Sequence, residues 1–180
     1  GVERAVSFDV PFAAKDAQVV HSLAKWKRMA LYRYHFSVGE GLYTDMNAIR
    51  RDEELDNLHS VYVDQWDWEK VIAPRDRTEV YLRRTVEAIA QALRETQSTL
   101  RSAFPVLNLL PGVDGQISFV TAQELEDRWP EFTAKERERA YVREHPLTFL
   151  MGIGGALKSG QPHDGRAPDY DDWTLNGDLL

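Results

Sequence analysis

Apolar and polar positions alternate in three stretches of this chain, which is the spacing of half-buried β-strands. Residues 5–10 form the first stretch, and we expect that strand to end at Pro11. Residues 42–50 and 58–69 form the other two, and the charged segment 51–57 separates them. Two β-rich runs around a polar connection are typical of an antiparallel hairpin, so the pattern predicts a hairpin with a long loop.

Helical spacing appears in two places. Ser22 has the side chain of a helix N-cap, and the residues after it predict a helix that runs to about residue 34. A longer helix is predicted from Thr78 to about residue 104, because its apolar residues recur on one stripe, as a core-facing helix requires. That stripe consists of Val86, Ile89, Leu93 and Leu100.

The second half of the chain mixes short strands with short helices. Residues 116–120 and 147–151 are predicted strands. Two helix starts carry the spacing of a capping box, in which Thr precedes Glu by three residues. The two pairs are Thr121 with Glu124 and Thr133 with Glu136. The mixture has no regular alternation, so it predicts an α+β fold with helices packed against one antiparallel sheet.

Composition narrows the classes of function. The 180 residues are 43% hydrophobic, which is enough to build the core of one domain. With 22 basic and 29 acidic residues the net charge is −7, which argues against broad binding of nucleic acid. The apolar runs are too short to cross a membrane and no export signal is visible, so a cytoplasmic location is expected. The absence of cysteine excludes disulfides, thiolate zinc sites and cysteine nucleophiles.

The second strand of the predicted hairpin is rich in side chains that can do chemistry. Period-two alternation gives two faces: His59, Val61, Val63, Gln65 and Asp67 on one, and Ser60, Tyr62, Asp64, Trp66 and Trp68 on the other. Neither face is cleanly apolar. Two interpretations therefore stay open. The strand is either an edge strand with one solvated face, or the floor beneath a polar ligand with Arg50 on the partner strand.

Four side chains, two from the hairpin and two from the first helix, are candidates for binding. Arg50 presents a rigid fork of donors that can hold a phosphate or a carboxylate at two points. His59 can lie beside a purine or bond a phosphate, although a lone histidine more often has a structural or surface role. Lys25 and Lys27 cannot share a face of the first helix because positions two apart diverge. At most one of these lysines therefore points into a cleft near Ser22.

Residues 163–173 are dense in carboxylates. Several carboxylates within a few residues suit Mg²⁺, and a fixed carboxylate can also bind an ammonium group. A solvated acidic loop is the plain alternative. Residues 151–155 are rich in glycine but lack the Gly-Lys-Ser/Thr ending of a phosphate-binding loop, so backbone packing is the better account of them.

Long ungapped stretches carry a family resemblance. They are residues 21–28 (HSLAKWKR), 39–44 (GEGLYT), 58–69 (LHSVYVDQWDWE), 166–173 (RAPDYDDW) and 176–178 (NGD). Together they resemble the ammonia-dependent asparagine synthetases of the A type, or aspartate–ammonia ligases, and the likeness runs over the whole chain. It implies a fold like the catalytic core of class II aminoacyl-tRNA synthetases, an antiparallel β-sheet flanked by helices, in a homodimer. Arg50, the charged loop and His59 fit the second motif of that superfamily, which holds ATP.

The resemblance also implies a reaction. The family joins L-aspartate, ammonia and ATP, with Mg²⁺, to give L-asparagine, AMP and pyrophosphate through a β-aspartyl adenylate. By resemblance, Arg50 bridges the α-phosphate and the acyl oxygen, and Gln65 holds the acyl group. Ser22 and Lys27 anchor the carboxylates of aspartate, and Asp171 anchors its ammonium group.

The remaining site residues come from the same resemblance. His59 and Ser60 are expected near the nucleotide, Asp178 near the ribose or the metal, and Asp67 in the amino-acid pocket; the metal ligands stay unassigned. Two other functions are open: a catalytic-domain fragment of an aspartyl- or asparaginyl-tRNA synthetase, and a non-catalytic paralogue that binds an amino acid or an adenylate. The family is longer at both ends and between residues 173 and 176, so 1–180 is expected to be a single, incomplete catalytic domain.

Overall fold

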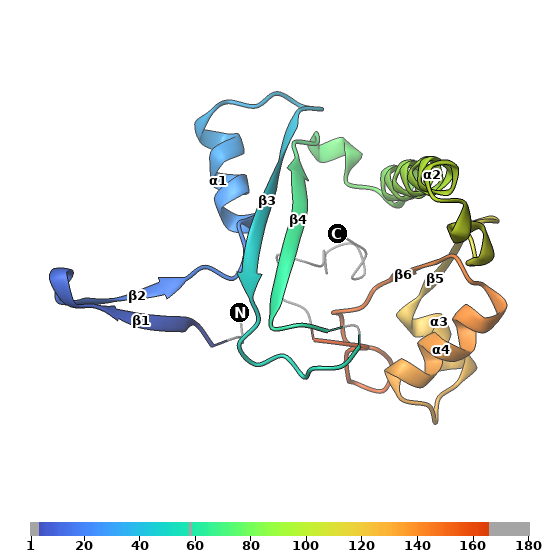
Figure 1. Cartoon of the computed structure of the whole chain (residues 1–180). Coiled ribbons are helices and arrows are strands. Elements are labelled where there is room, and N and C mark those ends of the chain that lie inside the picture. The colour runs from blue at the N-terminus through green and yellow to red at the C-terminus, as the bar shows by residue number, and fades with distance from the viewer. Residues whose placement is uncertain (1–3, 58, 166–180) are drawn as a thin grey trace. The chain divides into compact units, whose positions relative to one another are not determined.

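The computed structural model describes residues 4–57 and 59–165. The chain divides into two compact units, one up to Pro74 and one from Arg75 onward. Figure 1 shows the helices and strands of each unit. A search of the described residues for a helix with the length and apolarity of a membrane span finds none.

An antiparallel hairpin of β1 (Val6–Val10) and β2 (Lys15–Val19) opens the first unit. Strand β1 confirms the strand predicted over residues 5–10. Strand β2 was not predicted, because its sequence KDAQV contains only two apolar residues. The connection is a short 3-10 turn, η1 (Pro11–Ala13), closed by Ala14 in the left-handed conformation at φ 48°.

The rest of the first unit is a helix packed on a second hairpin. Helix α1 (Ala24–Arg33) contacts both β3 (Gly41–Ile49) and β4 (Tyr62–Lys70), which pair in antiparallel fashion. The predicted hairpin is therefore confirmed. Its register places Thr44 directly opposite Asp67, so these two side chains share one face of the sheet.

Strand β4 begins later than predicted, at Tyr62 rather than at residue 58. The backbone N–H of His59 donates to Asp56 Oδ1 at 2.8 Å, and the N–H of Tyr62 donates to Ser60 Oγ at 3.3 Å. Such local side-chain bonds compete with strand pairing. His59 and Ser60 consequently lie in the loop and not on a strand face, which corrects the prediction.

Helix α2 (Glu79–Ala103) dominates the second unit, after the 3-10 turn η2 (Pro74–Asp76) and before η3 (Pro105–Leu109). Its N-cap is Thr78, whose Oγ1 accepts a hydrogen bond from the N–H of Tyr81 at 3.3 Å. The predicted start of the long helix is confirmed.

The predicted core-facing stripe of α2 is wrong for three of its four residues. Val86 is buried together with Leu82 and Ala90, whereas the other three members are 44–51% exposed: Ile89, Leu93 and Leu100. Leu82 and Val86 form a core cluster with Met151 of the neighbouring strand. Four-residue strands reach only about 13 Å, whereas a 25-residue helix is about 37 Å long. The short strands therefore cover only the first turns of α2.

The second unit also contains a pair of strands joined by two helices. They are β5 (Ser118–Thr121), α3 (Ala122–Arg128), α4 (Ala134–Glu144) and β6 (Thr148–Met151). Strands β5 and β6 pair in parallel, which requires a crossover such as α3 and α4 provide. The predicted α+β class is confirmed. Within the described residues, however, the strands form three two-stranded sheets rather than one, and this last pair is not antiparallel.

Both predicted capping boxes are present. Thr121 Oγ1 accepts from the N–H of Glu124 at 3.1 Å, and Glu124 Oε2 accepts from the N–H of Thr121 at 2.7 Å. The same reciprocal pair joins Thr133 and Glu136, at 3.4 and 2.8 Å. Each box satisfies two of the N–H groups that a helix start leaves unpaired, which fixes where α3 and α4 begin.

Candidate functional site

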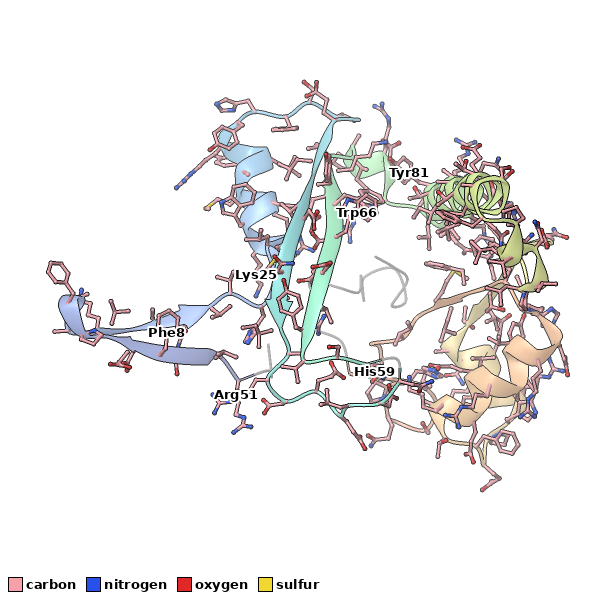
Figure 2. The ribbon with its side chains drawn as sticks, viewed as in Figure 1. Phe8, Lys25, Arg51, His59, Trp66 and Tyr81 are labelled. Atoms are coloured by element: carbon pink, nitrogen blue, oxygen red, sulfur yellow. The ribbon has the colours of Figure 1, made fainter. Side chains whose placement is uncertain are left out.

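One face of the β3–β4 hairpin lies against α1 and carries the candidate side chains. Burial alternates along both strands, so the inner residues of β3 and β4 are partly or fully buried. They are Leu42, Thr44, Met46 and Ala48 on β3 and Val63, Gln65, Asp67 and Glu69 on β4. The other face is exposed and aromatic: Trp66, labelled in Figure 2, lies 6.3 Å from Tyr43 between ring centroids. The alternation predicted for the second strand is confirmed from Tyr62 onward.

A buried lysine lies at the centre of the inner face. The side chain of Lys27 has no exposed surface, and its Nζ donates to Thr44 Oγ1 at 3.1 Å and to Asp67 Oδ1. The hydroxyl of Thr44 donates to the same Oδ1 at 2.8 Å. Asp67 keeps 33% of its side-chain surface exposed. The lysine is thus beneath the carboxylate, and the carboxylate is the member that other molecules can reach.

The carboxyl group of Asp67 is kept ionised by these two neighbours. Partial burial alone would raise the pKa of Asp67, but the hydrogen bonds from Lys27 and Thr44, together with the lysine charge, hold that pKa below its usual value. The ionised carboxylate of Asp67, held by the buried Lys27, can accept a hydrogen bond from a cationic ligand.

Lys25, by contrast, is exposed on α1 (Figure 2). The prediction that only one of Lys25 and Lys27 points inward is confirmed, and the structure identifies Lys27 as that residue. The reason is the helical spacing, which turns positions two apart by about 200°.

Gln65 is the second polar group of the inner face, two residues before Asp67 on β4. Its carbonyl oxygen Oε1 is buried and has no hydrogen-bond partner among the described residues. A buried polar oxygen without a partner costs free energy, so native proteins usually supply one from solvent or a ligand. Gln65 therefore belongs to the candidate site on geometric grounds.

Arg50 follows directly after β3. Its backbone N–H donates to the carbonyl of Val61 at 2.7 Å, which extends the hairpin one step beyond Ile49. Because Arg50 is four positions along the chain from Met46, which pairs with Gln65, Arg50 lies about 13 Å along the hairpin from Gln65. That length suits a ligand with two chemically different ends.

The predicted nucleotide residues His59 and Ser60 lie in the exposed loop between the two strands. The ring Nδ1 of His59 lies 2.8 Å from Asp56 Oδ1. The same loop is tied to the segment before β1, where Arg51 Nη1 donates to the carbonyl of Ala5 at 2.9 Å. Figure 2 labels Arg51 and His59 in this loop.

Ser22 does not cap α1, which corrects a second prediction. The N-cap is Leu23, and the helix begins at Ala24. Ser22 Oγ instead accepts from the N–H of Ala24 at 3.0 Å, a local turn one residue ahead of the helix. Asp171 and Asp178 lie outside the described residues. Between residues 4 and 165, leaving out 58, no group of three or more His, Asp or Glu side chains is placed to hold a metal ion.

The sequence did not predict that Thr44 lies beside Lys27 and Asp67. The hydrophobic pattern predicts the two strands but not their register, and it is the register that sets Thr44 opposite Asp67. A polar residue among the apolar inner positions of β3 was the available signal.

The second unit contains a hollow of about 710 Å³ that includes Arg83 and Arg94 in its wall. Both arginines have structural partners. Arg94 donates to the carbonyls of Val113 and Gly115 at 3.1 and 2.7 Å, and Arg83 donates to Glu79. These contacts account for the two arginines, and no predicted site residue lines the hollow.

A family model and individual relatives, compared with this sequence, give the same family. The sequence model of the aspartate–ammonia ligase family matches residues 1–180. The chain is 59% identical to an aspartate–ammonia ligase of Clostridium tetani over 182 residues, which cover all of this chain and 52% of that protein. It is 59% identical to the ligase of Ruminiclostridium cellulolyticum and 55% identical to that of Bacillus mycoides, over 53% and 54% of those proteins. The chain thus spans about half the length of the curated relatives it matches.

Proposed function

This chain belongs to the aspartate–ammonia ligase family, and we propose that it forms part of an enzyme that makes L-asparagine from L-aspartate, ammonia and ATP. The β-carboxylate of aspartate attacks the α-phosphorus of ATP, forming β-aspartyl adenylate and releasing pyrophosphate. Ammonia then attacks the acyl carbon, AMP leaves, and the nitrogen loses a proton to give the amide.

The observation that carries this proposal is the inner face of the β3–β4 hairpin. Gln65 and Asp67 offer two oxygens without a full set of partners at one point, and Arg50 lies about 13 Å further along. An acceptor-rich end suits an amino acid, and an arginine fork suits a phosphate. The spacing of the two ends suits an amino acid joined to a nucleotide.

The first step brings together two anions, the β-carboxylate of aspartate and the α-phosphate of ATP. The proposed residue roles reduce their repulsion. Arg50 bridges the α-phosphate and the acyl oxygen and offsets the charge that develops on the phosphate. Gln65 holds the acyl group by neutral hydrogen bonds that its amide N–H groups donate, which leaves Oε1 as an acceptor. The substrate carboxylate is the nucleophile, so the reaction needs no covalent intermediate on the protein.

The other proposed roles follow the family resemblance. The resemblance assigns Ser22 and Lys27 to the carboxylates of aspartate; the buried ammonium group of Lys27 also supports Asp67 from beneath. Asp67 lies in the amino-acid pocket. His59 and Ser60 contact the nucleotide from the loop between the strands. Asp171 and Asp178, outside the described residues, are assigned to the ammonium group and to the ribose or metal.

The family resemblance also supplies expectations for the fold, the oligomeric state, the cellular location and the metal. We expect a fold like the class II synthetase core, with residues 1–180 forming part of a single catalytic domain, a homodimer and a cytoplasmic location. Mg²⁺ enters as the partner of ATP. The described carboxylates form no cluster that would hold this ion, so the mechanism assigns none of them to it.

The test is product formation by the purified enzyme. With L-aspartate, ATP and ¹⁵N-ammonium, we expect labelled asparagine and AMP in equal amounts. AMP release without asparagine, or transfer of the amino acid to tRNA, would contradict the proposal. The tRNA synthetase alternative is not favoured, because relatives at 54–59% identity over the whole chain are aspartate–ammonia ligases. A non-catalytic paralogue would release no AMP.

A further inference from the structure

The hydroxyl of Thr44 lies between a buried cation and a carboxylate. It accepts from Lys27 Nζ at 3.1 Å and donates to Asp67 Oδ1 at 2.8 Å. Lys27 donates to the same Oδ1. Both donors therefore converge on one oxygen of the carboxylate, and the second oxygen, Oδ2, accepts no hydrogen bond from any described residue.

Stability alone does not explain why these three groups are bonded together. A buried ion pair contributes little net stability, because desolvation of the two charges offsets their attraction. A third group that bonds to both charges does restrict the side-chain torsion of the carboxylate. With Oδ1 held from two sides, Oδ2 is the oxygen left for a ligand, and a third of the Asp67 side chain is exposed.

The oxygens on this face favour one chemical class of ligand. An ionised carboxylate only accepts hydrogen bonds, and so does the carbonyl of Gln65, whose buried Oε1 has no described partner. The two residues are two positions apart on one face of β4, about 7 Å between Cα atoms. Two neighbouring acceptors suit a compact group with several donors and a positive charge, which describes an ammonium group.

We propose that Thr44 is a positioning residue: its hydroxyl, bonded to Lys27 and to Oδ1, turns the carboxylate of Asp67 so that Oδ2 receives an ammonium group. This inference rests on the proposed function, because that function supplies two ammonium groups. One is the α-ammonium of aspartate and the other is the free ammonium ion. The geometry identifies an ammonium group as the ligand, and kinetic measurements distinguish aspartate from free ammonium as its source.

The test compares Thr44→Val, which keeps the shape and loses the hydroxyl, with Thr44→Ser, which keeps the hydroxyl. Thr96→Val is the matched control, since that hydroxyl only bonds the carbonyl of Ala92 in its own helix. We expect Thr44→Val to raise the KM for one ammonium-bearing substrate about tenfold, with a smaller change in kcat. Thr44→Ser restores the KM, and Thr96→Val leaves it unchanged.

Which KM rises identifies the source of the ammonium group. A rise in the KM for aspartate assigns the α-ammonium, and a rise in the KM for ammonium chloride assigns the second substrate. Calorimetric binding of aspartate and of succinate, which lacks the amino group, gives an independent readout for the first case. There, Thr44→Val should weaken aspartate binding and leave succinate binding unchanged.

Three results would overturn the role of Thr44. They are unchanged KM values for both substrates in Thr44→Val, equal weakening for aspartate and succinate, or a Thr44→Ser variant as impaired as Thr44→Val. If Thr44→Val does not fold, Thr44→Ala takes its place in every comparison. A wild-type enzyme that makes no asparagine refutes the proposed function instead, and calorimetry then still decides whether Thr44 affects ammonium recognition.

Discussion

The ammonium group of Lys27 is completely buried beneath the carboxylate of Asp67, which keeps a third of its side-chain surface exposed. The two charges of this pair therefore have unequal access to water. If the lysine is removed, the carboxylate can be solvated. If the carboxylate is neutralised, the lysine remains buried with no counter-charge.

This inequality predicts unequal effects of two substitutions on stability. Asp67→Asn should lower the free energy of unfolding by about 3 kcal/mol, because it leaves a buried charge unpaired. Lys27→Met should change it by about 1 kcal/mol or less, since methionine fills similar space and Asp67 is solvated. Urea denaturation measures both, and Lys158→Met, from an exposed pair with Asp127, is the control with almost no effect. Equal losses in the two variants would contradict the burial of Lys27.

The same pair predicts a pH dependence of stability. The pKa of Asp67 is lowered in the folded protein by its hydrogen bonds and by Lys27, which outweigh the effect of burial. An aspartate in the unfolded chain has a pKa of about 3.9. As the pH falls past this value, the unfolded chain takes up the proton before the folded protein does, so the contribution of the pair to stability is lost on acidification. The stability advantage of wild type over Asp67→Asn should be constant near neutral pH and shrink as pH falls through the lowered pKa. An advantage that grows on acidification would contradict the lowered pKa.

The two lysines of α1 predict a simple contrast in activity. Lys25→Ala should leave the KM for aspartate unchanged and alter stability by about 0.5 kcal/mol at most, because the side chain is exposed. Lys27→Ala should raise that KM strongly, since it removes the support of Asp67. Steady-state kinetics on the two variants, each checked for folding by circular dichroism, decide this. A severe loss in Lys25→Ala would mean that the wrong lysine had been assigned to the site.

Features fixed within a few residues of chain were predicted well. The capping box at Thr133 depends on a spacing of three residues, and the contrast between Lys25 and Lys27 depends on helical geometry alone. The alternation along β4 likewise follows from the two-residue period of a strand. Local rules suffice for these because each involves only neighbouring positions.

Features that depend on distant partners were not predicted. Leu93 lies on a regular apolar stripe of α2 and is half exposed, because the strands that cover this helix are only four residues long. Thr44 was missed because its position opposite Asp67 is set by the register of the hairpin, which periodicity does not specify. The site residues that the family resemblance supplied remain predictions, and the contacts that join Lys27, Thr44 and Asp67 could not be predicted from the sequence.

Arg50 is predicted to act in the adenylation step. Arg50→Lys keeps the charge but loses the two-point fork, so the rate of AMP formation should fall about 100-fold or more. Arg51→Lys is the matched control, because its guanidinium donates to the carbonyl of Ala5 and has no part in the proposed chemistry. The readout is exchange of labelled pyrophosphate into ATP in the presence of aspartate. Near-normal exchange in Arg50→Lys would remove Arg50 from the mechanism.

We predict that Gln65 lowers the free energy of unfolding but is needed for asparagine formation. Its buried Oε1 has no partner among the described residues, so Gln65→Leu should keep or raise the free energy of unfolding, by up to about 1 kcal/mol, because an unsatisfied polar group is removed. The same variant should lose asparagine formation, since leucine cannot hydrogen-bond the acyl group. Gln91→Leu, an exposed glutamine of α2 paired with Glu95, controls for the substitution itself. A clear loss of stability in Gln65→Leu would show that the amide is satisfied within the fold, and full activity would exclude it from the site.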